Sequence, residues 1–119
     1  MTRCTWCTEE AWCPMESAAA VLGRTWHPAI VYHLLEAQPL RFSELEDRMH
    51  TVSGKVLSES LEDLEEKGLV DRTVNDGRPV QVEYQLTEYG EELSPVIEEM
   101  VAWGERFLRD ADTPEESIV

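Results

Sequence analysis

The residues most able to do chemistry in this chain are three cysteines near its start. Cys4 and Cys7 form a Cys-x-x-Cys pair, and Cys13 follows them. Such a pair is half of a zinc-site pattern, but a structural zinc site needs four ligands, and no histidine lies near in sequence. We therefore predict no metal and no cofactor, with Cys4 and Cys7 as thiols on a loose arm. A zinc site or a disulfide that includes Cys13 stays an alternative.

Cys13 differs from the other two because Pro14 follows it. Proline suits the first turn of a helix, so the sequence predicts a helix with Cys13 at its N-cap. The partial positive charge at a helix N-terminus favours the thiolate, which is the nucleophilic form, whereas Glu16 opposes this effect. Cys13 is therefore the candidate redox-sensing thiol, and Cys4 and Cys7 are near enough in sequence to resolve an oxidised form. The alternative is a buried, inert cysteine.

The composition predicts a single globular domain. The chain has 119 residues, of which 42% are hydrophobic, so it can form one modest core that a partner chain could complete. No stretch approaches the roughly 20 apolar residues of a membrane span, and the N-terminus lacks the apolar run of a signal peptide. We expect a cytoplasmic protein with no membrane contact.

The formal net charge of −15 and the pI near 4.4 argue against a nucleic-acid partner at first, because DNA binding needs a basic surface. The bias is similar to that of proteins from organisms with a very salty cytoplasm, such as halophilic archaea, where a strongly charged surface maintains solubility. The acid is unevenly spread. Residues 41–78 hold six of the ten basic residues, whereas residues 83–119 hold eleven acidic residues against Arg106 and Arg109. The central segment is thus less acidic than the C-terminal one.

The central segment begins with two predicted helices. The apolar positions of the first recur at helical spacing and are Phe42, Leu45 and Met49. Ser43 is its expected N-cap, with Glu46 three residues on. The second helix is expected to begin near Ser53, another capping hydroxyl, and to end at Lys67-Gly68. Its expected apolar stripe consists of Val56, Leu57, Leu61 and Leu64.

Two strands are predicted after these helices. Residues 69–74 resemble a strand, and in residues 80–86 the apolar side chains Val80, Val82, Tyr84 and Leu86 alternate with polar ones. Residues 75–79 predict a turn, because Asn, Asp and Gly tolerate positive φ. Helix, turn, helix and hairpin is the order of a winged helix-turn-helix. The predicted fold class is therefore mainly α with a small β-hairpin wing (α+β).

Two further helices are expected before the central segment. Residues 15–22 have Ala19, Val21 and Leu22 as apolar contacts and stop at Gly23. Residues 26–38 have Pro28 in the first turn, and their inward side chains are Ile30, Val31, Leu34 and Leu35. We expect His27 and His33 at surface or half-buried positions, with a metal-binding or proton-sensing role as the alternative.

A C-terminal helix is expected to start with Thr87 as its cap and to restart at Ser94-Pro95. A broad apolar band follows, which comprises Val96, Ile97, Met100, Val101, Trp103, Gly104, Phe107 and Leu108. The band is wider than one side of a short domain needs, so it is either core or a dimer face.

Five motifs occur in order: Cys13-Pro14, then residues 22–26, 41–45, 64–70 and 82–90. They resemble the HxlR family of small, MarR-related winged-helix transcription regulators over residues 12–107. The resemblance implies a homodimer that pairs its N- and C-terminal helices, and the expected interface residues are Val96, Met100, Trp103 and Phe107. Several members of the family carry a regulatory cysteine, reactive with oxidants or electrophiles, where Cys13 stands. The chain departs from the family at Thr25, where lysine is usual, and at the His-Pro after Trp26.

Double-stranded DNA is the partner that this resemblance implies, with the second helix in a major groove and the hairpin on a flanking backbone or minor groove. The candidate contacts are Arg41, Ser43, Arg48, Ser53, Gly54, Lys55, Ser58, Glu59, Arg78 and Gln81. Lys55 can reach a guanine edge or a phosphate, and Arg78 is the expected wing contact. Glu59 and Glu62 stand where the family tends to have neutral or basic residues, so we expect reduced attraction to phosphates.

The sequence thus predicts an arm (1–12), a winged domain with its dimerisation helix (13–109) and an acidic tail (110–119). The predicted function is a homodimeric regulator that binds a pseudo-palindromic DNA site and responds to a thiol event at Cys13. One alternative is a regulator that senses a small molecule between the dimer helices. Another is a protein–protein module that has lost DNA binding. No Ser/His/Asp or Cys/His set and no glycine-rich phosphate loop points to an enzyme.

Overall fold

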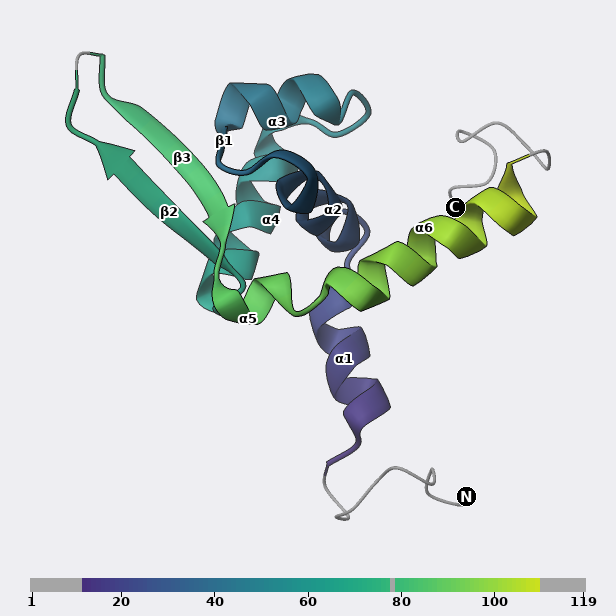
Figure 1. The fold of residues 1–119 in the computed structure, drawn as a ribbon. Coiled ribbons are helices and arrows are strands. Elements are labelled where there is room, and N and C mark those ends of the chain that lie inside the picture. Colours follow the sequence, from purple (N-terminus) through teal and green to yellow (C-terminus); the bar gives the residue numbers. More distant parts are fainter. Residues whose placement is uncertain (1–11, 78, 110–119) are drawn as a thin grey trace.

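The computed structural model describes residues 12–77 and 79–109, and its elements follow the predicted order (Figure 1). The helices are α1 (Pro14–Leu22), α2 (His27–Ala37), α3 (Phe42–Arg48), α4 (Gly54–Glu66), α5 (Glu88–Glu91) and α6 (Ser94–Leu108). The strands are β1 (Leu40–Arg41), β2 (Val70–Asn75) and β3 (Gln81–Leu86). The predicted arm with Cys4 and Cys7, the acidic tail and Arg78 lie outside the described residues.

The hydrophobic core lies where α2, α3 and α4 meet the base of the sheet. Ile30, Val31 and Leu34 of α2 are fully buried, as the sequence predicts, and Leu35 packs against them half-buried. The other buried apolar side chains are Leu40, Leu45, Met49, Leu57, Leu61, Leu64, Leu69, Val70, Leu86 and Ile97. Burial of such side chains is the main favourable term in folding, so this part of the chain carries its own core.

Two details predicted for the helix-turn-helix are wrong. Arg41, not Ser43, is the N-cap of α3, and its backbone N–H donates to the Glu44 carboxylate at 2.7 Å. The buried stripe of α4 contains Ser60 in place of Val56, which is 36% exposed. Positions 57, 60, 61 and 64 share one face at helical spacing, so the true stripe is rotated away from Val56.

Both ends of α4 are fixed as the sequence predicts. Ser53 caps the N-terminus, and its Oγ accepts a hydrogen bond from the Val56 N–H. Lys67 is the C-cap, and Gly68 has a φ of +80°, a backbone conformation that favours glycine. The N–H groups of Gly68 and Leu69 donate to the Glu65 and Leu64 carbonyls, which is a Schellman motif. The helix therefore stops sharply and turns into β2.

The sheet is antiparallel with the order β1–β3–β2, and Leu40 pairs with Tyr84 while Val70 pairs with Leu86. Strand β1 was not predicted, because a strand of two residues shows no periodicity. The hairpin projects from the body of the molecule (Figure 1). Its turn is closed by an Asx interaction in which the Gly77 N–H donates to the Asn75 side chain. Among the described residues only Gly68 has a positive φ, so the turn does not use the backbone freedom on which its prediction rested.

The two terminal helices contribute little to the core. No residue of α1 is buried: Val21 and Leu22 are half-buried, and Ala19 is exposed rather than packed as expected. Thr87 and Pro95 start α5 and α6 as predicted, but Ile97 is the one buried residue of α6. The terminal helices α1 and α6 extend away from the body in different directions (Figure 1). In the part of the chain that the structure describes, no helix is both long and apolar enough to cross a membrane.

Candidate nucleic-acid interface and thiol site

The face of α4 opposite its buried stripe carries the residues suited to read DNA. Lys55, Ser58, Glu59 and Glu62 are exposed there, and Gly54 at the first position is half-buried. Lys55 forms no ion pair within the described residues, so its ammonium is available to a guanine edge or a phosphate. Ser53 uses its hydroxyl oxygen as the cap acceptor, which leaves the hydroxyl proton able to donate to a phosphate oxygen.

Both arginines that the sequence assigns to phosphate contacts are partnered by carboxylates. The Arg41 guanidinium lies 3.8 Å from the Glu44 carboxylate, and the Arg48 guanidinium lies 3.4 Å from that of Glu36. These side chains are exposed, and exposed ion pairs contribute little stability. A phosphate must therefore compete with a carboxylate at each arginine.

The wing adds one basic residue that the sequence analysis overlooked. Arg72 is exposed on β2, paired across the sheet with Tyr84 of β3. Its place on the strand before the predicted turn is the signal that indicates it as a wing contact. Gln81 at the start of β3 is half-buried, so its amide has less freedom to reach DNA than an exposed residue.

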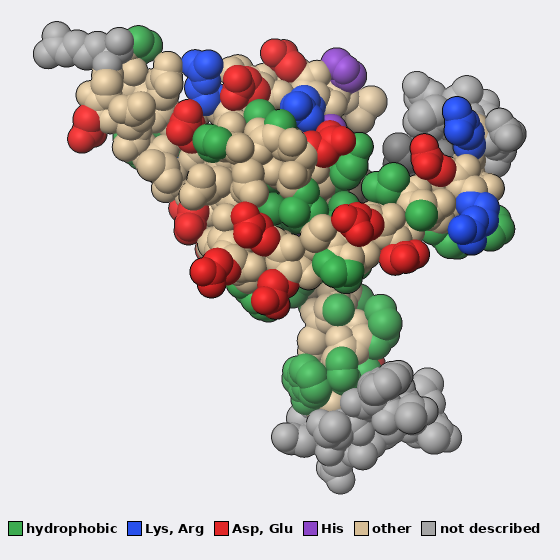
Figure 2. Space-filling view, viewed as in Figure 1, with side chains coloured by type: hydrophobic (Ala, Val, Ile, Leu, Met, Phe, Trp, Pro, Cys, Tyr) green, Lys and Arg blue, Asp and Glu red, His purple; other side chains and the backbone are tan. Residues whose placement is uncertain are grey.

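The surface is acidic on the face shown in Figure 2. Acidic side chains are scattered across it, while basic ones appear near α3 and toward the end of α6. Phosphate attraction provides most non-specific affinity for DNA. The arrangement therefore favours recognition that depends on base edges and DNA shape.

Cys13 is the N-cap of α1, as predicted. Its backbone is extended (φ −135°, ψ 125°), its carbonyl accepts from the Ser17 N–H at 2.9 Å, and its side chain is half-buried. Glu16 lies in the first turn. The thiol thus stands where α1 joins the segment before it. Within the described residues no three metal-ligating side chains gather in one place, whereas Cys4 and Cys7 lie outside them.

His27 contradicts its prediction, because its side chain is completely buried. Its Nε2 lies 2.7 Å from Oδ2 of Asp63 on α4, and the same oxygen accepts from the Lys67 ammonium at 2.6 Å. Hydrogen bonds from Lys67 and then His27 lower the pKa of Asp63 to about 2. Helical spacing could have found this residue, since position 27 precedes the buried positions 30, 31 and 34 on one face. His33 is half-buried as expected, and burial lowers its pKa.

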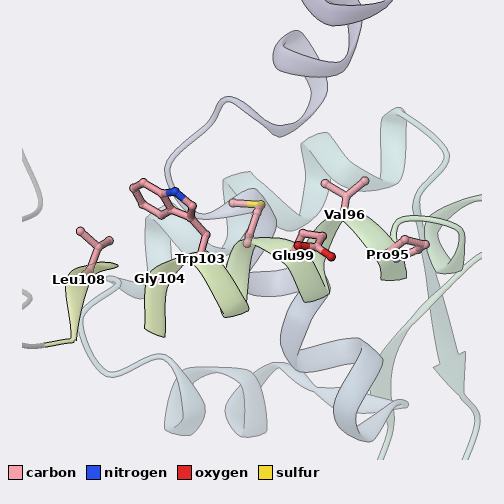
Figure 3. Close-up of a pocket in the computed structure, with 7 residues that line it drawn as sticks. Pro95, Val96, Glu99, Trp103, Gly104 and Leu108 are labelled. Carbon is pink, nitrogen blue, oxygen red and sulfur yellow. The ribbon is translucent and has the colours of Figure 1, made fainter. Parts of the chain in front are cut away.

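Exposed apolar side chains occur along the whole length of α6, with Glu99 among them. Val96, Met100, Trp103 and Phe107 have 44%, 48%, 56% and 56% of their surface exposed. Val96, Trp103 and Leu108 lie along an open groove of about 830 Å³ on this helix (Figure 3). The Trp103 and Phe107 rings are 5.6 Å apart between centroids. Contiguous exposed apolar surface of this kind is typical of interaction sites.

A helix-turn-helix with a β-hairpin wing and a capped, exposed α4 defines a winged-helix DNA-binding protein. The chain belongs to the HxlR-like helix-turn-helix family, whose sequence profile matches residues 21–112. It is a DNA-binding transcription regulator, and its relatives are regulators rather than enzymes.

Relatives with known sequences and structures agree with this assignment. The HTH-type transcriptional regulator YodB of Bacillus subtilis is 41% identical over 102 residues, which make up 85% of this chain and 90% of YodB. The structure of reduced YodB matches with a TM-score of 0.71 and 40% identity, over 85% of this chain and 99% of YodB. The redox regulator HypR in its oxidised form matches with a TM-score of 0.75 and 35% identity, over 79% of this chain and 96% of HypR. YodB is also known in a quinone-bound form, with a TM-score of 0.66 and 40% identity, over 80% of this chain and 100% of that one.

Proposed function

We propose that this regulator binds a pseudo-palindromic DNA site as a homodimer, and that a thiol event at Cys13 switches its affinity. The observation that carries the proposal is the position of Cys13, half-buried at the start of a helix that has no buried residue of its own. Chemical change at such a residue alters how α1 packs against whatever covers it.

A second copy of the chain is the proposed cover of the terminal helices. The α6 side chains Val96, Met100, Trp103 and Phe107 are about half exposed, and Met15 of α1 is 66% exposed. Their burial between two copies would remove apolar surface from water at roughly 25 cal/mol per Å². A symmetric dimer would also set two α4 helices about one turn of duplex apart, roughly 34 Å.

Hydrogen bonds between the start of α5 and the residues after α4 offer a physical route from the proposed dimer face to the DNA face. The helix α6 follows α5 directly, and Thr87 is the N-cap of α5. The Thr87 hydroxyl donates to the Gly68 carbonyl at 2.7 Å, and its N–H donates to the Leu69 carbonyl at 3.0 Å. Both acceptors lie just after α4, which is the proposed DNA-reading helix. We therefore expect a displacement of α5 and α6 to shift the C-terminal end of α4.

The relatives support a thiol signal. HypR is described as a redox regulator, and YodB is known in reduced, diamide-treated and quinone-bound forms. Diamide oxidises thiols and quinones alkylate or oxidise them, so both reagents are suitable signals to test here. Cys4, Cys7 and the Cys13 of a second subunit are the candidate thiols that would resolve an oxidised Cys13.

The test is duplex binding by reduced and diamide-treated protein in high potassium, with the operator first selected from a random duplex pool. We expect tight binding in one state and clear loss in the other, reversed by a reducing agent. Equal affinities in both states contradict a thiol switch. Sedimentation of the same samples shows whether both states are dimers.

A second candidate signal is a small apolar molecule, which two cavities between α2 and α6 favour. Their volumes are about 210 and 330 Å³, and Tyr32, Ile97 and Val101 line both. A ligand there would change the angle between α6 and the core without any cysteine chemistry. Ligand-dependent DNA binding that survives in a Cys13→Ser protein would favour this candidate.

A further inference from the structure

One buried polar contact joins α2 to the reading helix α4, and the functions described so far do not use it. His27, the first residue of α2, is 0% exposed, and its Nε2 lies 2.7 Å from Oδ2 of Asp63. Within the described residues this is the sole side-chain hydrogen bond between α4 and another helix.

The remaining contact between α2 and α4 is apolar. Ile30, Val31 and Leu34 of α2 belong to one core with the α4 side chains Leu57, Leu61 and Leu64. Apolar burial is non-directional, and close packing in the core already limits how far α4 can turn. A hydrogen bond depends on both distance and angle. The His27–Asp63 bond therefore adds a directional constraint on the rotation of α4 about its axis.

Such a rotation matters most for the residues that face DNA. A turn of roughly 10° moves a side-chain tip about 8 Å from the helix axis by more than about 1 Å. Lys55 and Ser58 lie on the same helix as Asp63, about two turns and one turn before it. A displacement of about 1 Å is enough to spoil a bidentate contact with a base, whereas a contact with a phosphate tolerates it.

The contact leaves one ring nitrogen of His27 unsatisfied. The Nδ1 atom of His27 is buried without a hydrogen-bond partner, and a buried polar atom left in that state costs stability. Replacing buried polar pairs with apolar residues of similar volume is often neutral or stabilising. The Lys67 ammonium already holds the other side of the Asp63 carboxylate, so His27 is not needed to keep that carboxylate partnered.

We propose that His27 and Asp63 are positioning residues for DNA recognition: their hydrogen bond fixes the rotation of α4 and so sets sequence specificity. The role is independent of the dimer and of Cys13, and it rests on the DNA-binding function of the family. Loss of the bond should reduce the affinity for the operator while the affinity for unrelated DNA stays the same.

The test compares His27→Leu with the unaltered protein on two duplexes of equal length, a selected operator and an unrelated sequence. Leucine fills the buried space without a polar atom, so the variant should be at least as stable in thermal unfolding. We expect its ratio of specific to non-specific affinity to fall roughly tenfold or more, as for one lost base contact. His27→Gln, which keeps a donor near Asp63, should recover part of the ratio.

Matched controls separate positioning from folding. His33→Leu changes the other described histidine of α2, which has no hydrogen bond to α4 among the described residues. Lys67→Ala removes the other donor to Asp63, and both variants should keep the ratio. Asp63→Ala acts on a side chain that is 25% exposed, so it tests the same bond even if His27→Leu does not fold. The double variant His27→Leu/Asp63→Ala should lose no more than either single change. An unchanged ratio in a folded His27→Leu or Asp63→Ala protein overturns the proposal, as does a loss that merely follows stability.

Discussion

The central part of the chain and its two ends differ in how much apolar surface they bury. From α2 to β3 every helix buries an apolar stripe in a shared core, and α4 is capped at both ends. By contrast α1 has no buried residue and α6 has one. Figure 2 shows hydrophobic side chains gathered on the surface of α1, and further ones beside charged residues along α6. The reading unit, α2 to β3, has its own core within one chain, whereas the terminal helices expose the apolar surface that the proposed second subunit would cover.

Under the proposed mechanism, this contrast makes one small domain both rigid at its DNA face and switchable at its ends. A fixed α4 keeps its DNA-facing side chains in register, because its core contacts do not depend on a second subunit. Terminal helices with few contacts of their own respond easily to a change at Cys13 or at the interface, since regions with few buried contacts have low local stability. Changes in the two regions should therefore have different consequences.

The largest effect on stability is expected in the reading unit. Leu64→Ala removes a fully buried side chain of α4 and should lower the free energy of unfolding by about 2–5 kcal/mol. Denaturant unfolding measures this change. Met15→Ala in α1, at a side chain 66% exposed, serves as the control and should change the stability of a monomer very little. Similar losses for both variants would contradict the contrast.

Charged residues on α6 should separate the subunits without unfolding them. Trp103→Asp together with Phe107→Asp places two carboxylates in the proposed interface, and the desolvation of unpaired charges opposes association. We expect monomers by sedimentation, with operator affinity reduced about a hundredfold because two half-sites no longer bind together. The reading unit should still fold, although the subunit loses stability that depended on the dimer. An unaltered protein that sediments as a monomer at micromolar concentration would disprove the dimer.

Substitutions on the DNA face should affect binding but not folding. Lys55→Ala should weaken operator binding by about 1–3 kcal/mol if the ammonium reaches a base edge or a well-placed phosphate. Arg78→Ala, at the wing, is expected to do the same from its position in the sequence. Glu62→Gln should leave affinity equal or slightly higher, because it removes a negative charge from the face. Two basic variants that bind normally would move the interface away from α4 and the wing.

A small effect is expected from acid, through Asp63. Its folded pKa of about 2 lies below the ordinary value of 3.8, so the ionised form stabilises the fold. This stabilisation is fully present above about pH 4 and is lost as the pH falls through about 2. It amounts to about 2 kcal/mol at most, since one pKa unit corresponds to about 1.4 kcal/mol. Unfolding curves of Asp63→Asn and the unaltered protein should therefore converge toward pH 2; parallel curves would contradict this.

Much of this contrast could be predicted from the sequence, because periodic apolar residues and capping residues leave clear patterns. The helix end at Lys67-Gly68, the cap at Ser53 and the inward face of α2 follow from such local rules. The apolar band on α6 also predicted an exposed apolar surface that a partner would bury. The proposed occupant, a second copy of the chain, lies in another molecule and leaves no pattern beyond exposure.

Features that depend on tertiary contacts were predicted less well. His27 resembles a surface residue until α4 places Asp63 beside it, and Ser60 is buried where Val56 was expected. The N-cap of α3 is Arg41 rather than Ser43, because the Glu44 carboxylate accepts a hydrogen bond from the Arg41 backbone N–H. Arg41 and Arg48 likewise form ion pairs with Glu44 and Glu36, and no single local rule predicts these partners.

The most direct test of the account is oxidant-dependent operator binding by Cys13→Ser. Serine keeps the capping geometry at the start of α1 but has no thiol to oxidise or alkylate. We expect Cys13→Ser to bind the operator with the affinity of the reduced protein and to show no response to diamide or quinone. Cys4→Ser and Cys7→Ser should respond partly or normally. A Cys13→Ser protein whose DNA binding still changes with oxidant would contradict the thiol switch and leave small-molecule sensing between α2 and α6 as the better account.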